Sequence, residues 1–249
     1  AFESYPSASF SGVDVYRLGV MTEYDKLNRV IRRTADSELG PLVTSYDYLP
    51  GFQRRTTNPR QFATTHAFQA FDKPEEDRIT GIWASEGVTV SIDRDVFGKA
   101  NFITRSGSSG ESATRRYVYD NGQRLCKTIE PESGATAQDY DDAGNVVWRA
   151  SGLSLPGTVC DGGSVPATRR VTFGYDLRNR LTSTSYGDGN GTLSRTYTPD
   201  GLLASATSAR PGVNTITWTY GYNSLRLLET ESFSYAGQTF DFRWSYDSN

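Results

Sequence analysis

The sequence is poor in the residues that build metal centres, with one histidine, two cysteines and one methionine among 249 residues. Since His66 is the single imidazole, neither a multi-histidine metal site nor a cysteine-rich zinc module can form. No apolar run approaches the roughly 18 residues of a membrane helix, and residues 1–20 lack the basic start and apolar core of a secretory signal. A net charge of -3 without a basic block argues against nucleic acid or anionic membranes as partners. We expect no metal, no cofactor and no membrane span.

Aromatic residues, in contrast, make up 12% of the chain, which is enough apolar area for a folded core and excludes general disorder. Several segments alternate between apolar and polar residues, the pattern of a half-buried strand. In residues 215–222, Ile216, Trp218, Tyr220 and Tyr222 alternate with threonine and glycine. No three-four apolar period of helical length is present. The sequence therefore predicts an all-β fold with one aromatic and one polar face.

A seven-residue phrase that begins with Tyr-Asp recurs along the chain. Good copies begin at Tyr24, Tyr46, Tyr119, Tyr140 and Tyr175, with a weaker one at Tyr197. Degenerate copies begin at Phe71, Arg94 and Tyr222, and Tyr246-Asp247 opens a copy that is cut off. Fixed-period repetition of this kind indicates one folding unit laid side by side many times.

The copies are 21 to 25 residues apart, except for one interval of 35. That interval contains a Gly/Ser/Pro-rich run at about 151–166, which we interpret as a surface loop inserted in one repeat. Residues 1–23 are expected to be a lead-in, the end of a preceding repeat. Residues 24–249 are the array, truncated within a repeat. A period of this length accommodates two strands and two turns, so each repeat is predicted to be a β-hairpin.

Each position of the phrase fits a strand that runs into a tight turn. The Asp can accept backbone N–H bonds in an Asx turn, and Gly or Asn three residues later tolerates a left-handed conformation. An arginine before the next aliphatic residue (Arg29, Arg124 or Arg180) can pair with the Asp of its own or a neighbouring turn. The structural repeat positions are therefore Tyr24, Asp25, Asn28, Tyr46, Asp47, Gly51, Tyr119, Asp120, Tyr140, Asp141, Gly144, Tyr175, Asp176, Asn179, Tyr197, Gly201, Tyr222, Tyr246 and Asp247.

This phrase and its period resemble the YD repeat of RHS-repeat proteins, which include bacterial polymorphic toxins, the C component of insecticidal toxin complexes and animal teneurins. The resemblance covers about nine tenths of the chain. It implies that tandem hairpins form a curved or spiral antiparallel sheet, part of a hollow shell that commonly encloses a C-terminal toxin. The chain departs from a complete member because it lacks the Asp-Pro-x-Gly-Leu self-cleavage segment and a toxin domain, and because it stops within a repeat. We therefore expect an open arc of an RHS shell, with unpaired edges that favour edge-to-edge self-association.

Other candidate sites have simpler structural explanations. His66 lies in a probable strand without a nucleophile motif beside it, so no catalytic residue is assigned. Two oxygen-rich stretches, residues 139–145 and 188–191, fit turns better than a calcium loop. A disulfide between Cys126 and Cys160 would pin the inserted loop to a neighbouring repeat, and the sequence leaves open whether it forms.

The first functional hypothesis is a non-catalytic fragment of an RHS shell. Its partners would be the remaining repeats of the parent protein and an enclosed or presented polypeptide toxin, in a protein that is secreted or at the bacterial cell surface. The alternative is an extracellular repeat module that binds carbohydrate or a cell-surface protein. An enzyme is a remote third reading that rests on His66 and scattered carboxylates.

Overall fold

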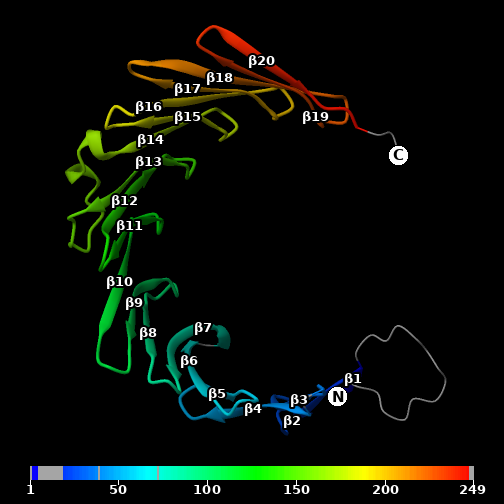
Figure 1. Ribbon diagram of the computed structural model, residues 1–249. Helices are drawn as coiled ribbons and strands as arrows, with labels where there is room; N and C mark the ends of the chain where they lie inside the picture. Colours follow the sequence, from blue (N-terminus) through cyan, green and yellow to red (C-terminus); the bar gives the residue numbers. More distant parts are fainter. Residues whose placement is uncertain (1, 5–18, 39, 72, 247–249) are drawn as a thin grey trace, which may run out of the picture. The chain divides into compact units, whose positions relative to one another are not determined.

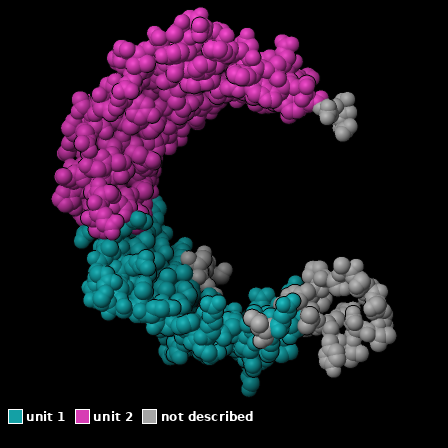
Figure 2. Space-filling view, viewed as in Figure 1, with its two compact units in different colours: residues 1–116 teal, residues 117–249 magenta. Residues whose placement is uncertain are grey.

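The computed structural model describes residues 2–4, 19–38, 40–71 and 73–246, and it is built almost entirely of antiparallel strands (Figure 1). The chain divides into two compact units, residues 1–116 and 117–249 (Figure 2), which we describe one at a time. Among the described residues, helix is limited to two 3-10 turns, neither of which could cross a membrane. The all-β prediction is confirmed.

In unit 1, each strand pairs antiparallel with the strand next to it in sequence, from β1 to β10. None of the buried apolar side chains of the described chain lies in this unit, as expected for a sheet one layer thick whose large residues stay half exposed. Its strands are β1 (Phe2–Ser4), β2 (Gly19–Tyr24), β3 (Val30–Ala35), β4 (Leu42–Leu49), β5 (Gln53–Thr57), β6 (Ala63–Phe71), β7 (Lys73–Ala84), β8 (Thr89–Arg94), β9 (Ala100–Ser106) and β10 (Ser112–Tyr119), which continues into unit 2.

Unit 2 continues the same pattern from β11 to β20, each strand hydrogen-bonded to its sequence neighbour. Among the described residues, β11 and β20 do not pair with each other, so this sheet is open. Its elements are β11 (Leu125–Glu130), β12 (Gly134–Tyr140), β13 (Val146–Leu153), η1 (Gly162–Ser164), η2 (Ala167–Arg169), β14 (Val171–Tyr175), β15 (Leu181–Tyr186), β16 (Gly191–Tyr197), β17 (Leu203–Arg210), β18 (Val213–Tyr222), β19 (Leu228–Tyr235) and β20 (Gln238–Arg243).

The predicted aromatic and polar faces are confirmed in β18–β20. Trp218 lies opposite Phe233, and Phe233 lies opposite Phe240, with ring centroids 5.7 and 6.2 Å apart. On the other face, the Thr207 and Thr217 hydroxyls are 3.3 Å apart. Cross-strand pairs of like side chains therefore hold neighbouring hairpins together on both faces.

The inserted segment is not merely a surface loop, which corrects the sequence interpretation. It folds back over β12 and β13, where Val165 is only 3% exposed. The Arg170 guanidinium lies 4.2 Å from the Trp148 ring centroid and donates to the carbonyls of Gly162 and Val165. The insertion thereby completes the buried cluster of the described chain, which contains Ala135, Ala137, Trp148, Ala150, Leu153 and Val165.

Candidate functional site

The Tyr-Asp phrases form a row of hairpin turns with one shared backbone geometry. In the turn that joins β14 to β15, the Asp176 N–H donates to the Arg180 carbonyl (3.0 Å) and the Asn179 N–H donates to the Asp176 carbonyl (2.9 Å). Asn179 has a φ of 58°. A type I turn followed by one left-handed residue matches the twist of the flanking strands, which explains why Asn or Gly suits this position.

The aspartate side chain closes the turn from inside. Asp176 Oδ1 accepts the amides of Arg178 (2.9 Å) and Arg180 (3.0 Å), and its Oδ2 accepts Arg180 Nε at 2.7 Å. Side-chain and backbone hydrogen bonds from Arg180 lower the pKa of Asp176 from 3.8 to about 2. The fork onto the aspartate of its own turn recurs for Arg29 with Asp25 and for Arg124 with Asp120.

In five phrases of unit 2, the opening tyrosine bonds back to the preceding repeat, and we call this contact the tyrosine staple. Its hydroxyl donates to the carbonyl of the aliphatic residue that ends the previous phrase. The staples of unit 2 run from Tyr140 to Leu125 (2.8 Å), Tyr175 to Val146 (3.0 Å), Tyr197 to Leu181 (2.8 Å), Tyr222 to Leu203 (2.9 Å) and Tyr246 to Leu228 (2.7 Å). Each of these five repeats is therefore fastened to its predecessor by a side-chain hydrogen bond in addition to the strand ladder.

The arginine of one turn also contacts the tyrosine of the next repeat. The Arg124 guanidinium lies 4.8 Å from the Tyr140 ring centroid, and the Arg180 guanidinium lies 4.4 Å from that of Tyr197. These distances fit a cation–π contact. Because the same guanidinium pairs with its own aspartate, each arginine couples its own turn to the following one.

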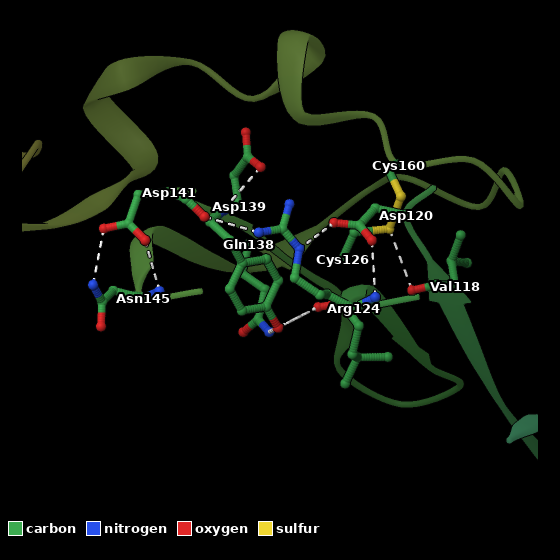
Figure 3. Close-up of polar contacts among 11 residues, drawn as sticks. Val118, Asp120, Arg124, Cys126, Gln138, Asp139, Asp141, Asn145 and Cys160 are labelled. Carbon is green, nitrogen blue, oxygen red and sulfur yellow. Dashed lines mark hydrogen bonds and ion pairs between the residues drawn. A yellow bond between two sulfur atoms is a disulfide. The ribbon is translucent and has the colours of Figure 1, made fainter. Parts of the chain in front are cut away.

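Direct turn-to-turn bonds complete the row. Arg124 donates to the Asp141 carbonyl at 2.9 Å (Figure 3). Asn145 Nδ2 donates to Asn179 Oδ1 at 2.9 Å, and Arg178 donates to the Pro199 carbonyl at 2.8 Å. Successive turns of unit 2 are therefore connected along one edge by side-chain hydrogen bonds.

One predicted copy does not form this turn, which corrects the alignment of the repeats. Tyr46 and Asp47 lie inside β4, and the chain reverses at Pro50-Gly51, where Gly51 has a φ of 77°. Tyr48 makes the staple instead, with its hydroxyl 3.1 Å from the Val30 carbonyl and its ring centroid 4.1 Å from the Arg29 guanidinium. The shift by two residues keeps the tyrosine on the same face of the strand.

Other copies use different side chains in the same geometry. Gln123, rather than the adjacent Gly122, holds the left-handed position after Asp120, and Thr198 Oγ1 replaces a carboxylate in the phrase that starts at Tyr197. Asn58 closes an equivalent turn by accepting the amides of Arg60 and Phe62. The Tyr-Asp pattern does not reveal this turn, because Thr57 and Asn58 take the places of the tyrosine and the aspartate. The degenerate phrase at Phe71-Asp72 and the end of Tyr246-Asp247 reach residues 72 and 247, which lie outside the described residues.

Cys126 and Cys160 form a disulfide, with Cα atoms 5.6 Å apart, that ties the insertion to β11 (Figure 3). Next to it, Lys127 Nζ lies 2.6 Å from Asp161 Oδ2, and the lysine side chain is fully buried. The repeat pattern does not predict this ion pair, because nothing in it places residues 127 and 161 together.

The remaining candidate residues lie in strands or turns of the described part of the chain. His66 pairs with Arg54 and Ile82 across the sheet, and burial lowers its imidazole pKa. Asp141 bonds Asn145, and Asp188 bonds the amide of Asn190. Within the described ranges, no group of three His, Cys, Asp or Glu residues is placed to hold a metal ion.

Comparison with known proteins gives a match in structure alone. No family model matches the chain, and neither does any curated protein. Among solved structures, 90% of the chain matches a Tc holotoxin pore of Photorhabdus luminescens with the mutation TccC3-D651A, at a TM-score of 0.51 and 11% identity. A second match, a TcdB2-TccC3-Cdc42 crystal structure, covers 93% of the chain at 12% identity and a TM-score of 0.46.

The chain spans 15% of the length of each of these two structures. The conclusion about the fold rests on the first match, since the second superposes less well. Low identity with a shared fold is expected here, because the repeat fixes only the turn residues and the alternation of the strands. At the level of its fold, the chain therefore resembles part of the Tc holotoxin pore structure.

Proposed function

We propose that this chain is a non-catalytic stretch of the wall of a secreted bacterial toxin complex. The observation that carries the proposal is the row of five tyrosine staples in unit 2, in each of which a repeat donates a hydrogen bond to the repeat before it. Such an array can extend by adding repeats without a change of design, as a wall requires. Its partners are further repeats of the parent protein and a polypeptide cargo that the wall encloses or presents.

Two further observations support the proposal. The fold is shared with part of a Tc holotoxin pore structure. The Cys126–Cys160 disulfide fits a protein that works outside the reducing cytosol. No observation favours the alternative of a module that binds glycans or a cell-surface protein, and the solved structures above lend that alternative no support.

The test uses the complete gene product, with the segments that flank this array. If the wall encloses a cargo, a protease should leave the cargo segment intact in the native protein and digest it in a Tyr175→Leu/Tyr197→Leu variant, whose staples are lost. A Tyr186→Phe variant is the control, because this half-exposed tyrosine lies at a hairpin tip and makes no staple. Enclosure would be refuted if the protease digested the cargo segment of the native protein as fast as that of the double variant.

A further inference from the structure

In the segment 154–161 of the insertion, the partly buried Leu155 packs against the Trp148 cluster, and a covalent and an ionic anchor lie at the other end. Cys160 is disulfide-bonded to Cys126 on β11, and the adjacent Asp161 pairs with Lys127. Most of the segment is exposed, including Val159 at 62%. We call residues 154–161 the strap.

The second half of the insertion is held differently. Val165 is buried against the Trp148 cluster, and Arg170 donates to two carbonyls of this half while its guanidinium lies over the Trp148 ring. These contacts do not involve either cysteine. The second half of the insertion can therefore keep its place when the disulfide is lost.

The two cysteines differ in their access to solvent. Cys126 is 5% exposed, whereas Cys160 belongs to the exposed part of the strap. A thiolate reductant needs access to a sulfur in line with the bond that breaks, and exposed disulfides are the labile ones. A reductant can therefore reach this bond from the Cys160 side.

We propose that the Cys126–Cys160 disulfide is a redox-controlled latch for the strap, and that its reduction opens an amine site at Lys127. One thiolate of a dithiol reductant attacks Cys160 Sγ, forms a mixed disulfide and releases Cys126 as a thiolate. The second thiolate then displaces Cys160. Two electrons pass to the protein, the cysteines take up two protons, and the reductant leaves as a disulfide.

The Lys127–Asp161 ion pair does not hold the strap closed by itself. The Lys127 side chain is fully buried and that of Asp161 is 21% exposed, so the lysine charge has given up its hydration and the carboxylate part of its own to form the pair. Opening returns both groups to water, which offsets most of the attraction that is lost. The covalent bond makes the closed state persist, because it holds Asp161 next to Lys127 at a high local concentration.

The experiment measures acetylation of lysines by an N-hydroxysuccinimide ester, read by mass spectrometry, in oxidised and reduced protein. Reduction should raise the rate at Lys127 on the order of 100-fold, the constraint that a cross-link closing a loop of this size supplies. Lys26, exposed on a turn of unit 1, is the internal control and should not change. A Cys160→Ser variant should label at Lys127 without reductant, and reoxidation of the native protein should restore protection.

Hydrogen exchange on the same samples distinguishes a disulfide that holds only the strap from one that supports all of unit 2. We expect faster exchange in the strap after reduction, while the amides of β15–β19 keep their protection. Equal labelling of Lys127 in both redox states would overturn the proposal. Labelling that appears only with loss of protection throughout β15–β19 would also overturn it, because the disulfide would then support the whole unit.

Discussion

The tyrosine staple at Tyr197 allows a test of how successive repeats hold together. Its hydroxyl donates to the Leu181 carbonyl at 2.8 Å, and the Arg180 guanidinium lies over its ring. Tyr197→Phe removes the hydrogen bond and keeps the ring. The local free energy of opening should fall by about 1 kcal/mol, the net value of a partly buried hydrogen bond.

Native-state hydrogen exchange measures this loss where it occurs. A change of about 1 kcal/mol corresponds to roughly fivefold faster exchange, which we expect for amides of β15–β17 that open locally. Tyr197→Leu should add about 0.5–1 kcal/mol, because the cation–π contact with Arg180 is lost as well.

Tyr186→Phe is the matched control, since this tyrosine is 43% exposed and no hydrogen bond of its hydroxyl is found within the described residues. It should change exchange by less than about twofold, as expected for a surface substitution. If Tyr197→Phe and Tyr186→Phe behaved alike, the staple would contribute nothing. If Tyr197→Phe accelerated exchange equally throughout unit 2, the contact would not act between neighbouring repeats.

Three other predictions concern the turns and the insertion. Asp176 has a folded pKa of about 2 against an ordinary 3.8, so its contribution to stability is complete above about pH 5 and is lost as the pH falls through about 2. An NMR titration of its carboxyl carbon with a midpoint near 4 would contradict this. Gly144→Ala should cost about 1–2 kcal/mol in urea unfolding, because φ is 86° while no atom lies within 4 Å of the added Cβ; an unchanged midpoint would show that the turn relaxes. Replacing Cys126 and Cys160 by serine should lower the free energy of opening the strap by about 3–4 kcal/mol, since the bond closes a loop of 34 residues; equal exchange of the strap amides in the native and the double-serine protein would exclude this.

Local chemistry made the fold predictable from the sequence. An aspartate followed by Gly or Asn three residues later specifies a turn through contacts inside that turn, and alternation assigns the two faces of a strand. The predicted Asx turns and the forks of Arg124 and Arg180 onto their own aspartates are present.

Contacts between repeats were less accessible to sequence reasoning. The phrase at Tyr46 matches the pattern, yet Pro50-Gly51 forms a competing turn and Tyr48 makes the staple. The closure of the insertion depends on Val165, Arg170 and the disulfide, whose partners are distant in sequence. Composition marked this segment as irregular but could not show which surface it covers.

The direction of the staples affects how such arrays should be dissected. A tyrosine hydroxyl donates to a carbonyl of the hairpin that comes before it. A fragment cut at the boundaries of a seven-residue phrase therefore loses the staple to its last aliphatic carbonyl, and its first tyrosine hydroxyl has no acceptor. A fragment for expression should instead end after the tyrosine of the following copy. Modules exchanged between related proteins should have the same boundaries, so that each aliphatic residue is transferred together with the tyrosine that donates to its carbonyl.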